Sequence, residues 1–101
     1  MLIGQIAKNI VADRTPASIL QIRAQFYDLL THCIPATNII KTLAFKLVAL
    51  VDDDVKAEVI MYAATYENRI KEGTKAIFHL EAFVVKIMKM LEEYHMGLMD
   101  I

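Results

Sequence analysis

The stretch from Ala63 to Met88 constrains the fold most, because two helical patterns meet in it at a glycine. Gly73 suits a helix end, where glycine takes a left-handed conformation at little cost, and Thr74 is a favourable N-cap for the next helix. That helix is predicted to run from Lys75 to about Tyr94, and its apolar arc is too wide for one buried stripe. The arc contains Ile77, Leu80, Phe83, Val84, Ile87, Met88 and Leu91, and Phe78, Ala82 and Val85 extend it around a further side. We therefore expect this helix to need a second surface to pack against, which indicates an assembly element.

The composition points the same way. A chain of 101 residues fits one domain that folds without a disulfide or a metal. Apolar residues make up 56% of it, above the usual share of a soluble domain, so the excess must enter a large core or an interface. The apolar runs Leu43–Val51 and Ala76–Leu91 contain charged residues and fall short of the roughly 18 uninterrupted apolar residues of a membrane span. No secretory signal is expected either, since no basic region precedes an apolar core.

The charge balance argues against some partners. Eleven basic residues face twelve acidic ones, whereas a domain that binds nucleic acid by itself usually has a basic excess. We therefore expect no membrane contact and no autonomous nucleic-acid binding. The single cysteine, Cys33, rules out an internal disulfide and is expected to be a small buried thiol.

The pattern predicts an all-α fold, a single bundle of about five helices over residues 1–101. Thr15 and Pro16 form a helix start signal, and Pro35 opens a further helix in the same way. The predicted helices are residues 2–12, 16 to about 31, a third after Pro35, about 54 to 72, and 75 to about 94. The third is apolar nearly all round, which places it centrally. We expect core positions at Ile19, Ile22, Phe26, Leu29, Leu30, Ile39, Ile40, Leu43, Leu47 and Leu50.

The fourth predicted helix has two apolar faces. One consists of Val55, Val59, Tyr62, Ala63, Tyr66 and Ile70, and a second, small-residue face consists of Ala57, Ile60 and Ala64 and would let another helix approach. Three aspartates, Asp52, Asp53 and Asp54, are expected to cap the helix and complement its dipole. A calcium loop is excluded, because Lys56 and Ala57 stand where ligand and glycine are needed.

Glu81 falls inside the apolar arc of the fifth predicted helix. A carboxylate buried there must be paired, because an unpaired buried charge is costly, and this would make Glu81 an oriented polar contact. Alternatively, its side chain reaches the solvent edge. The sequence leaves both readings open.

The chain offers no constellation of catalytic or metal-binding residues. Its three histidines, His32, His79 and His95, lie on or near different predicted helices. His32 and Cys33 are adjacent, but neighbours on a helix point roughly 100° apart, so adjacency does not make a thiol–base pair. No zinc-ligand spacing and no phosphate-binding loop is present. We expect no catalytic residue, no cofactor site and no metal site in this chain.

Four segments resemble the C-terminal domain of a eukaryotic replication factor C small subunit, of the subunit 3/5 type. They are TPASILQIRAQFYDLL (15–30), LLTHCIP (29–35), AATYENRIKEG (63–73) and KAIFHLEAFVVKIM (75–88). Their order and spacing fit the family over most of the chain. The chain departs from it at Ala36 and Thr37, where members commonly have a second proline and an acidic residue, and at Asn68, often a histidine.

The resemblance implies a function that composition does not show. The parent would be a nuclear AAA+ protein whose ATP-binding module, with ATP and Mg, and lid lie N-terminal to this chain. The C-terminal domains of five subunits would form a helical collar that holds the heteropentamer together while it loads the sliding clamp onto primer-template DNA. The predicted subunit interface contains Ile60, Ala64, Phe78, Glu81, Val85 and Met88. On this reading Glu81→Arg should weaken pentamer assembly more than it weakens folding.

Three other readings make different predictions. A free-standing helical adaptor would bind an amphipathic partner helix in an exposed groove and would begin naturally at Met1. A small enzyme using Cys33 and His32 would have a thiol that alkylates readily at neutral pH. Direct DNA binding would weaken steeply with salt, and the balanced charge argues against it.

Overall fold

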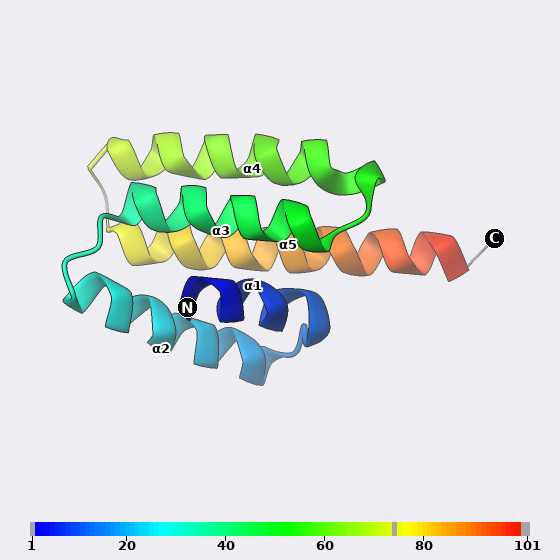
Figure 1. Cartoon of the computed structure of the whole chain (residues 1–101), viewed down its shortest axis with the longest axis horizontal. Coiled ribbons are helices and arrows are strands. Elements are labelled where there is room, and N and C mark those ends of the chain that lie inside the picture. Colours follow the sequence, from blue (N-terminus) through cyan, green and yellow to red (C-terminus); the bar gives the residue numbers. More distant parts are fainter. Residues whose placement is uncertain (1, 74, 100–101) are drawn as a thin grey trace.

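The computed structural model describes residues 2–73 and 75–99 and contains five α-helices in that part of the chain (Figure 1). The helices are α1 (Leu2–Ala12), α2 (Pro16–Thr31), α3 (Ala36–Leu50), α4 (Asp53–Lys71) and α5 (Ala76–Met99). The described residues include no strand, and the predicted all-α bundle is confirmed. The long helices α3, α4 and α5 lie along one another, and α1 and α2 cover one side of this layer.

One hydrophobic core joins all five helices. Its largest fully buried side chains are Ile6, Ile10, Ile22, Phe26, Ile39, Ile40, Leu43, Leu47, Val59, Leu80, Phe83 and Ile87. The whole predicted arc of α5 is buried, including Met88 and Leu91. Helix α3 packs against α1, α4 and α5 and is central, as predicted.

The structure corrects part of the core prediction. Leu50 is 42% exposed, because it is the last residue of α3 and no further turn covers it. Ile19 and Leu30 are only partly buried at the edge of the core. Helix α3 is also less apolar around its circumference than predicted, since Lys41 and Lys46 face solvent.

Local sequence explains where the helices begin. The Thr15 hydroxyl accepts a hydrogen bond from the Ser18 amide at 3.3 Å, and Pro16 occupies the first turn of α2, as predicted. Asp52 makes no such side-chain cap for α4. Instead, Asp53 and Asp54 place negative charge in the first turn, where the helix dipole stabilises it. The predicted cap Thr74 lies outside the described residues.

Two turns place residues in the left-handed region. Gly73 has φ +93° and ends α4 as predicted. Cys33 has φ +63° at the end of α2, where its amide bonds the Leu30 carbonyl and the Ile34 amide bonds the Leu29 carbonyl. This turn lifts Cys33 away from the bundle, so its thiol is exposed and not buried as expected. The His32 Nδ1 donates to the Asp28 carbonyl at 2.8 Å, which ties the imidazole to its own helix.

Helix α5 is longer than predicted, and polar contacts join the residues around its predicted end to other parts of the chain. It continues past Tyr94 to Met99 and projects beyond the other helices (Figure 1). Arg14, between α1 and α2, contacts Glu92 at 2.6 Å and His95 at 3.2 Å. On the other side, the Tyr94 hydroxyl donates to Asp54 at 3.0 Å. This hydrogen bond, followed by desolvation, raises the pKa of Tyr94 to about 12.

Candidate interface surfaces

Two grooves with exposed apolar side chains lie on different sides of α4. Ile60 and Ala64 line a groove between α3 and α4, whereas Tyr66 lines a groove formed with α2 and α5. Successive helical residues are separated by about 100°. The side of α4 that contains Ile60 and Ala64 therefore points about 160° away from the side that contains Tyr62 and Tyr66. Helix α4 is therefore shared by two surfaces that face in different directions.

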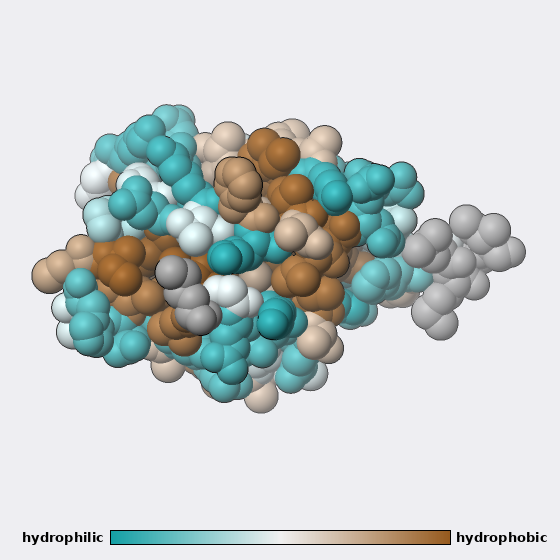
Figure 2. Space-filling model, in the orientation of Figure 1, coloured by the Kyte–Doolittle hydropathy of each residue, from teal (hydrophilic) through white to brown (hydrophobic). Residues whose placement is uncertain are grey.

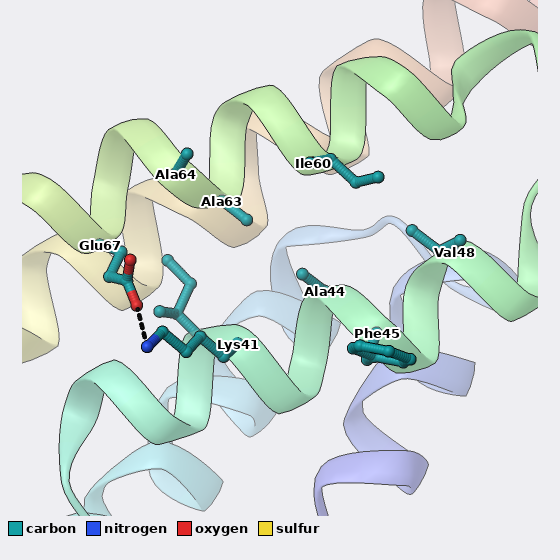
Figure 3. Close-up of a pocket in the computed structure, with 9 residues that line it drawn as sticks. Lys41, Ala44, Phe45, Val48, Ile60, Ala63, Ala64 and Glu67 are labelled. Atoms are coloured by element: carbon teal, nitrogen blue, oxygen red, sulfur yellow. Dashed lines mark ion pairs between the residues drawn. The ribbon is translucent and has the colours of Figure 1, made fainter.

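The first surface, the α3–α4 groove, is almost entirely apolar. It has a volume of about 440 Å³ and is lined by Ile40, Lys41, Ala44, Phe45, Val48, Ile60, Ala63, Ala64 and Glu67. Figure 2 shows apolar side chains in a band across α3 and α4. In the close-up, Val48 of α3 and Ile60 of α4 point towards each other, the small side chains of Ala44 and Ala63 project from the two helices between them, and the Phe45 ring lies beside α3 (Figure 3).

An ion pair closes one end of the α3–α4 groove. Lys41 Nζ lies 3.1 Å from Glu67 Oε2 (Figure 3), and Lys71 contacts the other oxygen of Glu67 at 3.9 Å. The Glu67–Lys71 pair predicted from the sequence is thus a minor part of a bridge between α3 and α4. Of the residues that line the groove, Lys41 and Glu67 carry charge, and they offset each other, so the rest of the wall is apolar.

The second surface, which we call the α2–α5 groove, combines apolar and charged side chains. It has a volume of about 530 Å³ and is lined by Arg23, Tyr66, Phe78, Glu81, Ala82, Val85, Lys86 and Lys89. Tyr66 connects this groove to the core, because its ring lies edge-on to buried Phe83 at a centroid distance of 6.1 Å. The exposed residues Phe78 and Val85 provide the apolar part.

Glu81 is both paired and partly exposed. Its Oε2 lies 3.3 Å from Arg23 Nε, and the two side chains are 29% and 38% exposed respectively. Contact with Tyr27, and then the charge of Glu81, raise the pKa of Arg23 above its ordinary value. Each of the two readings of Glu81 is therefore partly right: the carboxylate has an oriented partner, and it stands at the solvent edge of the arc.

Cations cover several aromatic rings around this second groove. The Arg69 guanidinium lies 4.9 Å from the centre of the Tyr66 ring, and Lys86 Nζ lies 5.3 Å from the Tyr62 ring. Lys75 Nζ lies 5.8 Å from the Phe78 ring. Such contacts leave the positive charge in place, since the aromatic face is neutral overall.

The structure divides the predicted interface residues between these two surfaces. Ile60 and Ala64 belong to the α3–α4 groove, and Phe78, Glu81 and Val85 belong to the α2–α5 groove. Ile60 and Phe78 are 57% and 56% exposed. The sixth predicted residue, Met88, is 4% exposed and lies in the core of the chain, so it offers no surface to a neighbour.

Sequence reasoning missed Phe45, which is 83% exposed and is the largest apolar protrusion of the α3–α4 groove. A signal was available in the helical period. Phe45 is two residues from both Leu43 and Leu47, so it points about 160° away from these core positions. An aromatic residue on the outer face, between Lys41 and Lys46, is unexpected in a helix that buries only one stripe.

No group of three histidine, cysteine or acidic side chains that could hold a metal ion occurs among the described residues. None of the helices in the described part of the chain is long and apolar enough to cross a membrane.

Comparison with known proteins gives a consistent family. The model of the family described as "Replication factor C subunit 3, C-terminal domain" matches residues 1–95. Replication factor C subunit 5 of Neurospora crassa is 64% identical over 97 residues, which cover 96% of this chain and 28% of the relative. Human replication factor C subunit 3 is 44% identical over 90 residues, covering 89% of this chain and 25% of the relative. Subunit 5 of Schizosaccharomyces pombe is 42% identical over 96 residues, covering 95% and 27%. The chain thus spans about a quarter of the length of these relatives.

Proposed function

The chain belongs to the C-terminal domain family of replication factor C subunit 3, and we propose that it is the assembly domain of a clamp-loader small subunit. On this proposal it joins other replication factor C subunits in a heteropentameric collar. The collar supports ATP-dependent loading of the sliding clamp onto primer-template DNA in the nucleus. ATP and Mg would bind to an ATPase module outside this chain, and DNA would be contacted by the complex as a whole.

The observation that carries the proposal is the pair of grooves with exposed apolar side chains, one between α3 and α4 and one between α2 and α5. A subunit in a closed ring contacts two neighbours through two different surfaces, since each contact is head-to-tail. Ile60 and Phe45 stand on one such surface, and Phe78 and Val85 stand on the other. Exposed apolar residues of this size, gathered in grooves with polar rims, are typical of protein interfaces.

The proposal is tested by assembly of the full-length subunit. It would be co-expressed with the other replication factor C subunits of the same organism, one of them tagged, and the complex would be recovered and sized by gel filtration. We expect the unmodified subunit to co-purify in a five-subunit complex. Phe45→Glu and Phe78→Glu should each reduce its recovery, because each places a charge in a surface that a neighbour would desolvate.

A matched control separates assembly from folding. Leu20 of α2 is 65% exposed and lines neither groove, so Leu20→Glu makes the same chemical change elsewhere and should leave recovery unchanged. Thermal unfolding of each variant shows whether the fold persists. Failure of the unmodified subunit to co-purify with any other subunit would refute the proposed function.

A free-standing adaptor that binds an amphipathic helix is the second candidate, and the apolar α3–α4 groove is the observation that favours it. Helix-in-groove recognition needs one such surface. The two candidates differ in the α2–α5 groove, because an adaptor with a single site would tolerate Phe78→Glu in every assembly assay.

A further inference from the structure

Four side chains of α5 form a row along the α2–α5 groove, and we call this row the seam. Phe78, Ala82, Val85 and Lys89 follow one another on α5 at intervals of four, three and four residues, and all of them line the groove. This is the spacing at which a helix presents a continuous ridge to a partner helix. Phe78 and Val85 are exposed in the chain, and the small side chain of Ala82 between them allows close approach.

The charge along this seam is uneven. Glu81 and Arg23 neutralise each other at 3.3 Å, which leaves Lys86 and Lys89 as the remaining charges of the lining. In residues 2–73 and 75–97, neither lysine forms an ion pair with a carboxylate. Lys86 lies over the neutral ring of Tyr62, so its charge remains available to a partner.

Two carboxylates do lie beyond the groove. Glu58 and Glu93 line the adjoining hollow together with Lys86 and Lys89. Glu93 is fifteen residues after Phe78 on α5, which is about 22 Å along the helix axis. The seam therefore runs from an aromatic residue with Lys75 above it, through small and aliphatic residues, to two lysines. Apart from Glu81, which is paired with Arg23, its acidic neighbours lie in the adjoining hollow.

We propose that the α2–α5 groove receives an amphipathic helix from a neighbouring replication factor C subunit, with carboxylates facing Lys86 and Lys89. The occupant has apolar side chains at i, i+3 or i+4, and i+7, which pack on Phe78, Ala82 and Val85. Its acidic residues follow within a turn of the last apolar position. This inference rests on the proposed function and adds the chemistry of the partner at one of its two surfaces.

The lining of the groove argues against two other occupants, a second copy of this chain and nucleic acid. A second copy of this chain would bring like charges together in either orientation: a parallel arrangement faces Lys89 with Lys89, and an antiparallel one brings Lys75 towards Lys86 and Lys89. Nucleic acid would suit the lysines, but it would leave the apolar ridge of Phe78 and Val85 without a partner.

Charge reversal in the assembled complex tests the proposal. The full-length subunit with Lys86→Glu and Lys89→Glu together would be co-expressed with the other replication factor C subunits. We expect about a tenfold loss of affinity for one neighbour, since two attractive contacts become repulsive. A neutral variant, Lys86→Met with Lys89→Met, keeps the side-chain stems and should lose about threefold. The neutral variant adds no negative charge beside Glu93, so its loss of affinity would not be due to misfolding caused by repulsion from Glu93.

The control uses two lysines of a different surface. Lys8 and Lys46 are exposed and line a hollow between α1 and α3, so Lys8→Glu with Lys46→Glu changes the net charge equally and should leave assembly unchanged. In the unmodified complex, zero-length carbodiimide cross-linking joins lysines to carboxylates. Mass spectrometry should find Lys86 or Lys89 joined to an aspartate or glutamate that follows the predicted apolar pattern in another subunit.

The possible results are distinguishable. If the unmodified subunit assembles and both lysine variants assemble equally well, the inference is overturned while the proposed function stands. A cross-link from these lysines to a second copy of the chain also overturns it. So does normal assembly combined with weakened binding of primer-template DNA, which would identify nucleic acid as the occupant. If the unmodified subunit does not assemble at all, both proposals fall together.

Discussion

Truncating Phe45 should weaken assembly strongly while leaving the fold of the chain almost unaffected. Phe45 is 83% exposed, so Phe45→Ala removes little packing within the chain, and we expect the free energy of unfolding to change by less than about 0.5 kcal/mol. A neighbour that covers the α3–α4 groove would bury the exposed fraction. Full burial of a phenylalanine contributes about 1.5–3 kcal/mol, and 83% of the middle of that range is about 2 kcal/mol. The expected loss is therefore about 30-fold in affinity.

The assay compares two measurements on the same variant. Chemical denaturation gives the stability of the domain, and titration of the full-length subunit into a complex of the remaining subunits gives the affinity. Leu20→Ala is the matched control, because Leu20 is exposed but lies outside both grooves. An affinity within twofold of the unmodified protein would refute our view that Phe45 lies in an interface. A large loss of stability would refute the view that it is free of the core.

Three further predictions concern individual contacts. Cys33→Gly should stabilise the domain by up to about 1 kcal/mol, because φ is +63° at this position, and a rise of a few degrees in the thermal midpoint would check it; a fall would contradict it. Tyr94 should titrate near pH 12 and not near 10, since its hydroxyl donates to Asp54. A raised phenol pKa means that the fold favours the protonated form, so this contribution is complete below pH 10 and is lost towards pH 12. Ultraviolet titration, with Tyr94→Phe as reference, measures it, and a phenol that titrates near 10 would disprove the contact. Glu81→Arg should weaken assembly more than folding, as its sequence position predicts. The charge swap Arg23→Glu with Glu81→Arg restores the pair within the chain; if gel filtration shows that the swap also restores full assembly, Glu81 acts only on Arg23 and does not meet a neighbour.

Residues governed by local rules were predicted well. Thr15, Pro16 and Gly73 mark helix boundaries that the structure confirms, because caps and left-handed turns depend on a few neighbouring residues. The buried arc of α5 was also predicted, since it follows from the helical period alone. The contacts of Glu92 with Arg14 and of Tyr94 with Asp54 were not predicted, because these partners are distant in sequence, and α5 continues to Met99, past its predicted end.

The candidate surfaces could be identified only from the sequence and the tertiary structure together. The sequence identified a surplus of apolar side chains on α4 and α5, and five of the six residues it named lie on or at the edge of the two grooves. It could not separate them into two surfaces, because Phe78 and Ile60 are assigned to different grooves by the helices that pack beside them. It also included Met88, which the bundle covers.

The sequence by itself determined the number of helices, most of their boundaries and the family, because hydrophobic period, capping residues and the order of similar segments can be read along one dimension. Only the tertiary structure decided which apolar residues remain uncovered. Burial depends on the directions from which other helices approach, and so Met88 is hidden while Phe45 is exposed. The same reason explains Glu81, whose charge is balanced by Arg23 from a helix more than fifty residues earlier in the chain.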